Sequence, residues 1–348
     1  LLTYLPDGRR LQARIEIDAG RAALAAGAVN DGLERLRIAV ELAGGLDDPT
    51  IRGEASAALG TARVHTVAIT DPTGVGELRR ATEFARSAGD RDTAATAARE
   101  LAFVAVGSRS RGGARLLNEA RELAGDDDGK LSAVLGLDGL ELADSGRIDL
   151  AVAAFRKSVD HAERAGEPRK VAWSLTMLAH SELVAGRLEE ARNDITQAVA
   201  LVAESRWTAY LPLVLAIQAE LDLEEGNLDL AGERLTGAWS LATRLSDPCW
   251  LSVVGRGLGV LAARRDNPDE ALLWLDGAYR EPDHGVPLVS RWIDAATLDS
   301  ICDLTTSWLA PPRRRGRRGR AHRPQRARRD AHLRGASPGL PGARLTAR

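Results

Sequence analysis

The sequence is poor in the residues that build metal sites, disulfide frameworks and membrane spans. Its 348 residues include two cysteines, Cys249 and Cys302, which lie 53 positions apart with no CxxC pair and no nearby histidine. That spacing excludes an ordinary zinc site and a disulfide framework. Apolar runs are also short, as in residues 211–217, whereas a membrane span needs roughly 18 residues. We therefore expect a cytoplasmic protein with no membrane segment, no metal and no cofactor.

Aromatic residues and strand-like patterns are scarce as well. Aromatics make up 4% of the chain, and no segment alternates apolar and polar residues as a half-buried strand does. By contrast, hydrophobic residues make up 44%, and the helix-favouring residues Ala, Leu, Arg and Glu are abundant. This composition predicts an all-α fold.

Four columns of residues recur every 40 positions in the middle of the chain. Two columns of small residues are followed by one of large apolar residues and then by another of small ones. In order, the columns are Gly139, Ala179, Ala219 and Gly259; Ala151, Ala191, Ala231 and Ala271; Phe155, Ile195, Leu235 and Leu275; and Ser158, Ala198, Ala238 and Ala278. Small and large residues that alternate on a helix face let neighbouring backbones approach closely. The period therefore predicts helical hairpins stacked into an elongated array.

From Arg10 to Tyr279 the order of these columns is similar to the tetratricopeptide (TPR) repeat signature. The resemblance implies a right-handed α-solenoid of about seven TPR-like helical hairpins with a period near 40. TPR units usually span about 34 residues, and HEAT repeats share the longer period. The longer period also resembles the repeats of MalT and LuxR-type bacterial regulators, in which an ATPase precedes such an array. This implies a fragment of an ATP-dependent transcriptional regulator, with ATPase and DNA-binding domains of the same full-length protein as partners.

We predict two regions, a TPR-like repeat domain at residues 1–309 and an Arg/Gly/Pro-rich tail at residues 310–348. The tail holds thirteen arginines and one acid and so carries +12; because the whole chain carries −2, the first 309 residues carry −14. The array stops after an eighth leading helix expected at residues 288–308. Three interpretations stay open: a disordered basic C-terminal tail, a shifted reading frame after about residue 302, or nucleic-acid binding through Arg313–Arg320.

The resemblance also implies a partner surface on the concave side, which the leading helix of each hairpin lines. We expect the inward-facing positions to lie six and three residues before, and one residue after, the first small column. The polar and aromatic residues chosen from these positions are Arg99, Phe103, Trp173, Thr176, His180, Glu220 and Arg256. Aromatic and arginine side chains often anchor interfaces, so we expect a protein or peptide partner in this groove. An alternative is that Trp173 only fills space between leading helices. The Lys and Asn residues of the TPR carboxylate clamp are missing, which argues against the binding of chaperone tails.

Motifs of catalysis and phosphate binding fail in spacing or context. Gly125–Lys130 lacks the spacing of a phosphate-binding loop and holds three aspartates that would repel a phosphate. Gly255–Gly259 reads GxGxG rather than GxGxxG, and Gly335–Gly339 has a proline after its serine. Four histidines, His65, His161, His180 and His284, lie in different hairpins without convergent ligands. We therefore predict a non-catalytic protein-interaction or signal-sensing module; the alternative to a regulator fragment is a free-standing TPR adaptor.

Overall fold

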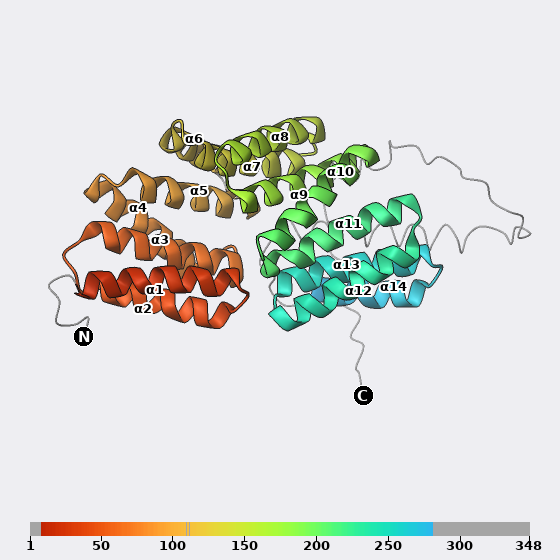
Figure 1. Ribbon diagram of the computed structural model, residues 1–348, viewed down its shortest axis with the longest axis horizontal. Coiled ribbons are helices and arrows are strands. Elements are labelled where there is room, and N and C mark those ends of the chain that lie inside the picture. Colours follow the sequence, from red (N-terminus) through yellow and green to blue (C-terminus); the bar gives the residue numbers. More distant parts are fainter. Residues whose placement is uncertain (1–7, 109, 111, 281–348) are drawn as a thin grey trace, which may run out of the picture.

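Fourteen α-helices and one 3-10 turn follow one another over the residues that the structure describes, which are 8–280 except 109 and 111 (Figure 1). The structure is a computed structural model. The helices are α1 Gly8–Ala25, α2 Val29–Gly44, α3 Pro49–Thr66, α4 Pro72–Ala88, α5 Arg91–Gly107, α6 Gly113–Ala124, α7 Asp128–Asp144, α8 Ile148–Arg164, α9 Pro168–Ala185, α10 Leu188–Glu204, α11 Leu211–Glu225, α12 Leu228–Leu245, α13 Pro248–Arg264 and α14 Pro268–Arg280, and the 3-10 turn η2 is Thr208–Tyr210. Each odd-numbered helix leads a hairpin and the next helix trails it, giving seven hairpins. The predicted all-α repeat fold is confirmed, while the expected helix at 288–308 and the tail lie outside the described residues.

The helices begin and end at the residue types that the sequence predicts. Asp48 caps α3 by accepting hydrogen bonds from the backbone N–H groups of Thr50 and Ile51, at 3.0 and 3.3 Å. At the turns within hairpins, Gly186 and Gly226 have φ angles of 78° and 83°. Asp266 occupies the equivalent turn with φ 58°. These left-handed conformations explain why glycine or aspartate recurs there.

The columns of the 40-residue period form the core. Ala151, Ala231 and Ala271 are 0% exposed, and the large residues Phe155, Ile195, Leu235 and Leu275 are at most 1% exposed. The small residues give the large ones their space. A β-carbon added at Gly139, for example, would lie 2.7 Å from two ring carbons of Phe155. The columns thus pack the two helices of each hairpin against each other. Contacts between successive hairpins, such as those of α8 with α9, extend this core along the array, as in stacked repeats.

We expect an Ala231→Leu substitution to lower the free energy of unfolding by about 1–3 kcal/mol, because added methyl groups in a filled core force the helices apart. Chemical denaturation measures the change. Gly237→Ala on the same helix, α12, is the control, since nothing lies within 4 Å of the added β-carbon. That variant is expected to be as stable as the parent or about 0.5–1 kcal/mol more stable. Equal melts for Ala231→Leu and the parent would contradict the register described above.

The leading helices form one side of the solenoid. Successive leading helices contact each other from α1 to α13, whereas successive trailing helices within the described residues make no comparable contacts. The trailing helices are therefore spread apart on the outside of the curve, and the leading helices line its inside. We call the surface of the leading helices that is turned away from their trailing helices the inner face.

The curve brings the first hairpin back to the sixth (Figure 1). Helix α1 contacts the 3-10 turn η2, between α10 and α11. In the turn between α1 and α2, a β-carbon added at Gly27 would lie 2.6 Å from Cδ2 of Leu245, the last residue of α12. We call this contact of α1 and Gly27 with η2 and Leu245 the seam. Because of it, the hairpins from the first to the sixth close into a ring of helices around the inner face.

Candidate partner-binding site

All seven residues predicted for the partner surface lie on leading helices. Arg99 and Phe103 are on α5, Glu220 is on α11 and Arg256 is on α13, and the remaining three, Trp173, Thr176 and His180, are on α9. Six of them are partly exposed. Thr176 is the exception and corrects the prediction, since it is 0% exposed and its hydroxyl donates to the Ala172 carbonyl at 2.7 Å. Thr176 therefore cannot contact a partner on the inner face.

Three of the predicted residues converge from three successive leading helices. The Nη1 group of Arg256 donates to Oε1 of Glu220, and Nε2 of His180 lies 4.0 Å from Oε2 of the same carboxylate. All three side chains are mostly shielded, with exposed fractions of 15% for His180, 12% for Glu220 and 18% for Arg256. Glu220 thus links α9, α11 and α13 through polar groups that still reach the surface. We call these three residues the inner triad.

A second polar cluster joins α3 and α5. Of its members, the sequence predicts Arg99 and Phe103 for the partner surface, but not His65 and Glu100. Oε2 of the fully buried Glu100 lies 2.9 Å from Nε2 of His65, and Oε1 accepts from Nη2 of Arg99. The His65 ring stacks on Phe103 with centroids 4.4 Å apart and an interplanar angle of 14°. Burial and, less strongly, the charge of Arg99 hold the pKa of His65 below its usual value. A carboxylate can only accept, so a neutral His65 donates to Glu100 in the tautomer that carries its proton on Nε2.

Burial also lowers the pKa of Arg99 to about 10, so that this guanidinium keeps its charge at neutral pH and neutralises Glu100. The sequence does not predict the burial of Glu100, because a glutamate in the middle of a helix is usually exposed to solvent. His65 was missed because its relation to Glu100 spans 35 positions rather than 40. Only the packing of α3 against α5 brings the two together.

Trp173 fills space between two leading helices, in agreement with the alternative interpretation. A β-carbon added at Gly136 of α7 would lie 2.4 Å from Cζ3 of Trp173. The indole also meets the buried ring of Phe155 edge-on, with centroids 6.2 Å apart. Since the ring rests on a glycine and on the core, packing accounts for its position. Its exposed part is still available to a partner.

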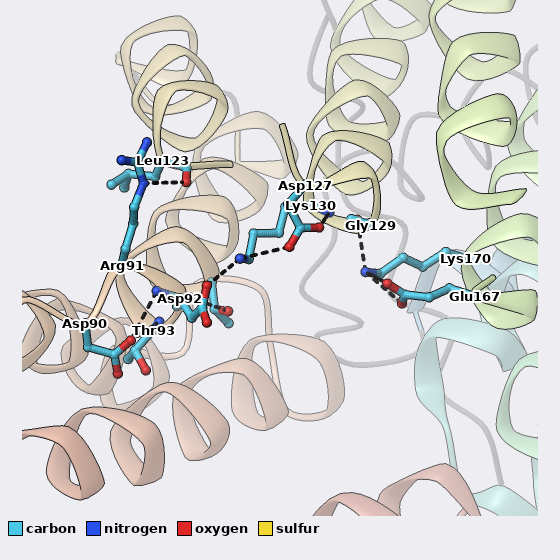
Figure 2. Close-up of polar contacts among 11 residues, drawn as sticks. Asp90, Arg91, Asp92, Thr93, Leu123, Asp127, Gly129, Lys130, Glu167 and Lys170 are labelled. Atoms are coloured by element: carbon cyan, nitrogen blue, oxygen red, sulfur yellow. Dashed lines mark hydrogen bonds and ion pairs between the residues drawn. The ribbon is translucent and has the colours of Figure 1, made fainter. Parts of the chain in front are cut away.

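The ends of the leading helices are tied together by a row of basic residues (Figure 2). Arg91 donates to the carbonyl groups at the end of α6, at 2.8 Å for that of Glu122. Lys130 pairs with Asp92 and Asp127, and Lys170 donates to the Gly129 carbonyl at 2.9 Å. These contacts join the third, fourth and fifth hairpins. They belong to the scaffold, because each charge is already satisfied within it.

Figure 2 also shows the contacts of the segment Gly125–Lys130, which superficially resembles a phosphate-binding loop. Asp127 accepts a hydrogen bond from the backbone N–H of Lys130 at 2.9 Å and caps α7, while the Lys130 ammonium group pairs with the same carboxylate. The groups that would hold a phosphate are thus engaged with aspartates. The segment is a turn that links two hairpins, as the sequence predicts.

Other candidate sites within residues 8–280 offer little chemistry. No group of three or more His, Cys, Asp or Glu residues there is placed to hold a metal ion. A cleft of about 350 Å³ beside α7 and α8 is lined mainly by Leu135, Leu142, Leu150 and Ala153, with Asp138 and Lys157 among its few polar groups. None of the predicted partner-binding residues contributes to that cleft. Across the same part of the chain, every helix is too short or too polar to cross a membrane.

Comparisons with known proteins bear on the fold alone. No family model matches the sequence, and no curated protein matches it either. Among solved structures, aspartyl phosphate phosphatase F from Bacillus subtilis is similar with a TM-score of 0.52 and 12% identity, over 84% of this chain and 94% of that one. A Rap protein complexed with Competence and Sporulation Factor is similar with a TM-score of 0.50 and 11% identity, over 84% of this chain and 98% of that one. The helical-repeat architecture is therefore shared with these proteins.

Proposed function

We propose that this protein is a non-catalytic interaction module that binds a protein or peptide partner on its inner face. The observation that carries the proposal is the inner triad, because three polar side chains from three hairpins meet there while remaining in reach of a partner. Arginine and aromatic side chains held in partly desolvated positions are typical anchors of interfaces. Phe103, Arg99 and Trp173 extend this surface along α5 and α9. The Rap protein of similar fold, complexed with Competence and Sporulation Factor, is a precedent for a solenoid of this kind with a bound factor.

Between the two forms of this function, we favour the free-standing adaptor. The chains of the similar solved structures are covered over 94% and 98% of their length by this chain, so a solenoid of this size makes up most of each of those chains. The interpretation as a fragment of a LuxR or MalT-type regulator gains no support from the comparisons. Its ATPase and DNA-binding partners stay predictions, as does nucleic-acid binding through the tail, which lies outside the described residues.

Site-specific photocrosslinking in cells tests the proposal. A benzoylphenylalanine residue at position 180, within the inner triad, is expected to capture a defined partner protein or peptide. The same residue at position 240, exposed on the trailing helix α12, is the control for random encounters. The proposal is wrong if position 180 captures nothing beyond what position 240 captures in a folded protein.

A charge-neutralising pair of variants then measures the contribution of the inner triad. Glu220→Gln and Arg256→Gln keep polar side chains but remove the charges, and together we expect them to weaken partner capture at least about tenfold. Binding of the captured partner, measured by calorimetry, provides the number. The exposed pair Arg115 and Glu119 on α6 is a matched control, and its neutralisation should leave affinity unchanged.

A further inference from the structure

Glu182 on α9 is a buried carboxyl group, and only one of its two oxygens accepts a hydrogen bond. The residue is 0% exposed. Its Oε1 accepts from Nη2 of Arg156 on α8 at 2.7 Å, but Oε2 has no donor from the described side chains or backbone. A buried carboxylate oxygen without a donor is costly, so the group needs either a partner or a proton.

The partner that approaches Glu182 is a second carboxyl group, Asp194 on α10. Asp194 occupies the repeat position that Arg234 occupies in the next hairpin, and Arg234 contacts Asp222, which lies forty positions after Glu182. The proximity of Asp194 contributes to the raised pKa of Glu182. Carboxylates only accept hydrogen bonds, so a hydrogen bond between the two requires that one of them keep its proton. The charged groups around the pair are Arg156 from α8 and Glu190 from α10. One cation therefore faces the pair, and Glu190 adds to the negative charge around it.

The next hairpin shows what an ordinary contact at this place looks like. Forty positions on from Glu182 and Asp194 lie Asp222 and Arg234. Nε of Arg234 donates to Oδ2 of Asp222 at 2.7 Å, which is an ion pair of opposite charges. The sixth hairpin thus closes its two helices with an acid and a base. The fifth hairpin does so with two acids.

We propose that Glu182 and Asp194 share a proton that holds α10 against α9, and that the fifth hairpin loosens when this proton is lost. Losing it places two negative charges side by side in a buried position, where their repulsion is weakly screened. His180 of the inner triad lies on α9, two residues before Glu182. A loosened α10 therefore changes the support of the inner face, and this last step rests on the function proposed above.

The pKa values agree with the geometry and set the pH range. Burial, with the neighbouring Asp194 as a smaller cause, raises the pKa of Glu182 to about 7. Burial raises the pKa of Asp194 as well. A carboxyl group whose pKa is raised on folding stabilises the folded state at pH values below its unfolded pKa. That contribution is lost as the pH rises through the folded pKa, here between about pH 4.5 and pH 7.

Backbone amide hydrogen exchange on the full chain tests the proposal, with α12 as the internal control. After correction for the intrinsic pH dependence, we expect exchange in α10 to rise about tenfold between pH 6 and pH 8.5, and exchange in α12 to change little. Asp194→Asn should abolish the rise, because an amide can donate to a charged Glu182. Asp194→Arg, which copies the neighbouring hairpin, should abolish it too and guards against failure of the first variant to fold.

Two outcomes would overturn the proton-sharing pair. One is an equal pH response in α10 and α12 of the parent protein; the other is a response in α10 that persists in both Asp194 variants. Neither measurement involves a partner. A failure here therefore leaves the proposed interaction function standing, and a failure of photocrosslinking at position 180 leaves the proton-sharing pair standing.

Discussion

Replacing Phe155 by alanine is expected to lower the free energy of unfolding by about 3–5 kcal/mol, the largest effect that we anticipate for one substitution. Phe155 is 1% exposed on α8 and is among the largest fully buried side chains of the described residues. Its ring covers Gly139 within its own hairpin and meets Trp173 of the next one. The cavity left by alanine would thus weaken both the fourth hairpin and its contact with the fifth.

Urea denaturation followed by tryptophan fluorescence and by circular dichroism measures this loss, since Trp173 reports on the packing next to the cavity. Leu150→Ala is the matched control on the same helix, because Leu150 is 54% exposed. Its effect should stay within about 1 kcal/mol. A similar loss for both variants would show that Phe155 does not hold adjacent hairpins together. Because stacked repeats can unfold in parts, the two probes should be compared before a single free energy is assigned.

Removing the carboxyl group of Glu100 is expected to cost about 2–4 kcal/mol in the Glu100→Ala variant. Glu100 is 0% exposed and serves both the His65 imidazole and the Arg99 guanidinium. Without it, a desolvated positive charge and an imidazole N–H lose their acceptor. The cost falls short of that of a wholly buried pair, because 28% of the Arg99 side chain and 40% of that of His65 remain exposed.

Chemical denaturation at pH 7 gives the size of the Glu100 effect, and Glu119→Ala provides the comparison. Glu119 forms an exposed pair with Arg115 on α6, and such pairs contribute about 0–1 kcal/mol. A loss of the same size at Glu100 and at Glu119 would contradict the view that the buried carboxylate organises the cluster between α3 and α5.

The same cluster predicts how acid acts on the protein. A histidine whose pKa is lowered on folding stabilises the folded state above its unfolded pKa, near 6.5. That contribution is lost progressively as the pH falls below this value, because the unfolded chain then takes up a proton that folded His65 resists. We expect His65→Phe, which keeps the stacking on Phe103, to lose less stability between pH 7 and pH 5 than the parent. An equal loss would contradict this prediction. The opposite pH response of Glu182 is common to both proteins and cancels in the comparison.

The repeat columns were readable from the sequence because they are a property of successive hairpins. Ala191 and Ala231 each meet the same kind of neighbour, so one 40-residue period predicts both environments. The inner triad also follows from the period, since His180 and Glu220 occupy the same position in adjacent leading helices. Thr176 did not follow, because the closeness of the packing around α9 decides whether a position near the inner face is exposed.

The contacts of the buried carboxyl groups Glu182 and Glu100 could not be predicted from the sequence, for a different reason. Glu182 and Asp194 depart from the pattern of the neighbouring hairpin, and nothing in a period shows that the two acids meet. Their contact depends on the distance between α9 and α10, with Arg156 arriving from a third helix. A similar argument holds for Glu100, whose partner His65 lies outside the 40-residue spacing. Glu182 and Glu100 are therefore placed by the packing of particular helices against each other rather than by the repeat itself.

The seam gives the array a folding behaviour that an open stack of repeats lacks. In an open stack, stability is close to a sum over repeats and their nearest neighbours, and damage at one end fades along the chain. Gly27 and Leu245 are separated by 218 positions and yet meet, so the first and sixth hairpins stabilise each other directly. Forming this contact requires the closure of a long loop, which comes late and slows folding. Once formed, it couples the unfolding of the first and sixth hairpins. Unfolding of the first hairpin therefore destabilises α12 directly, even where the repeats between them stay folded.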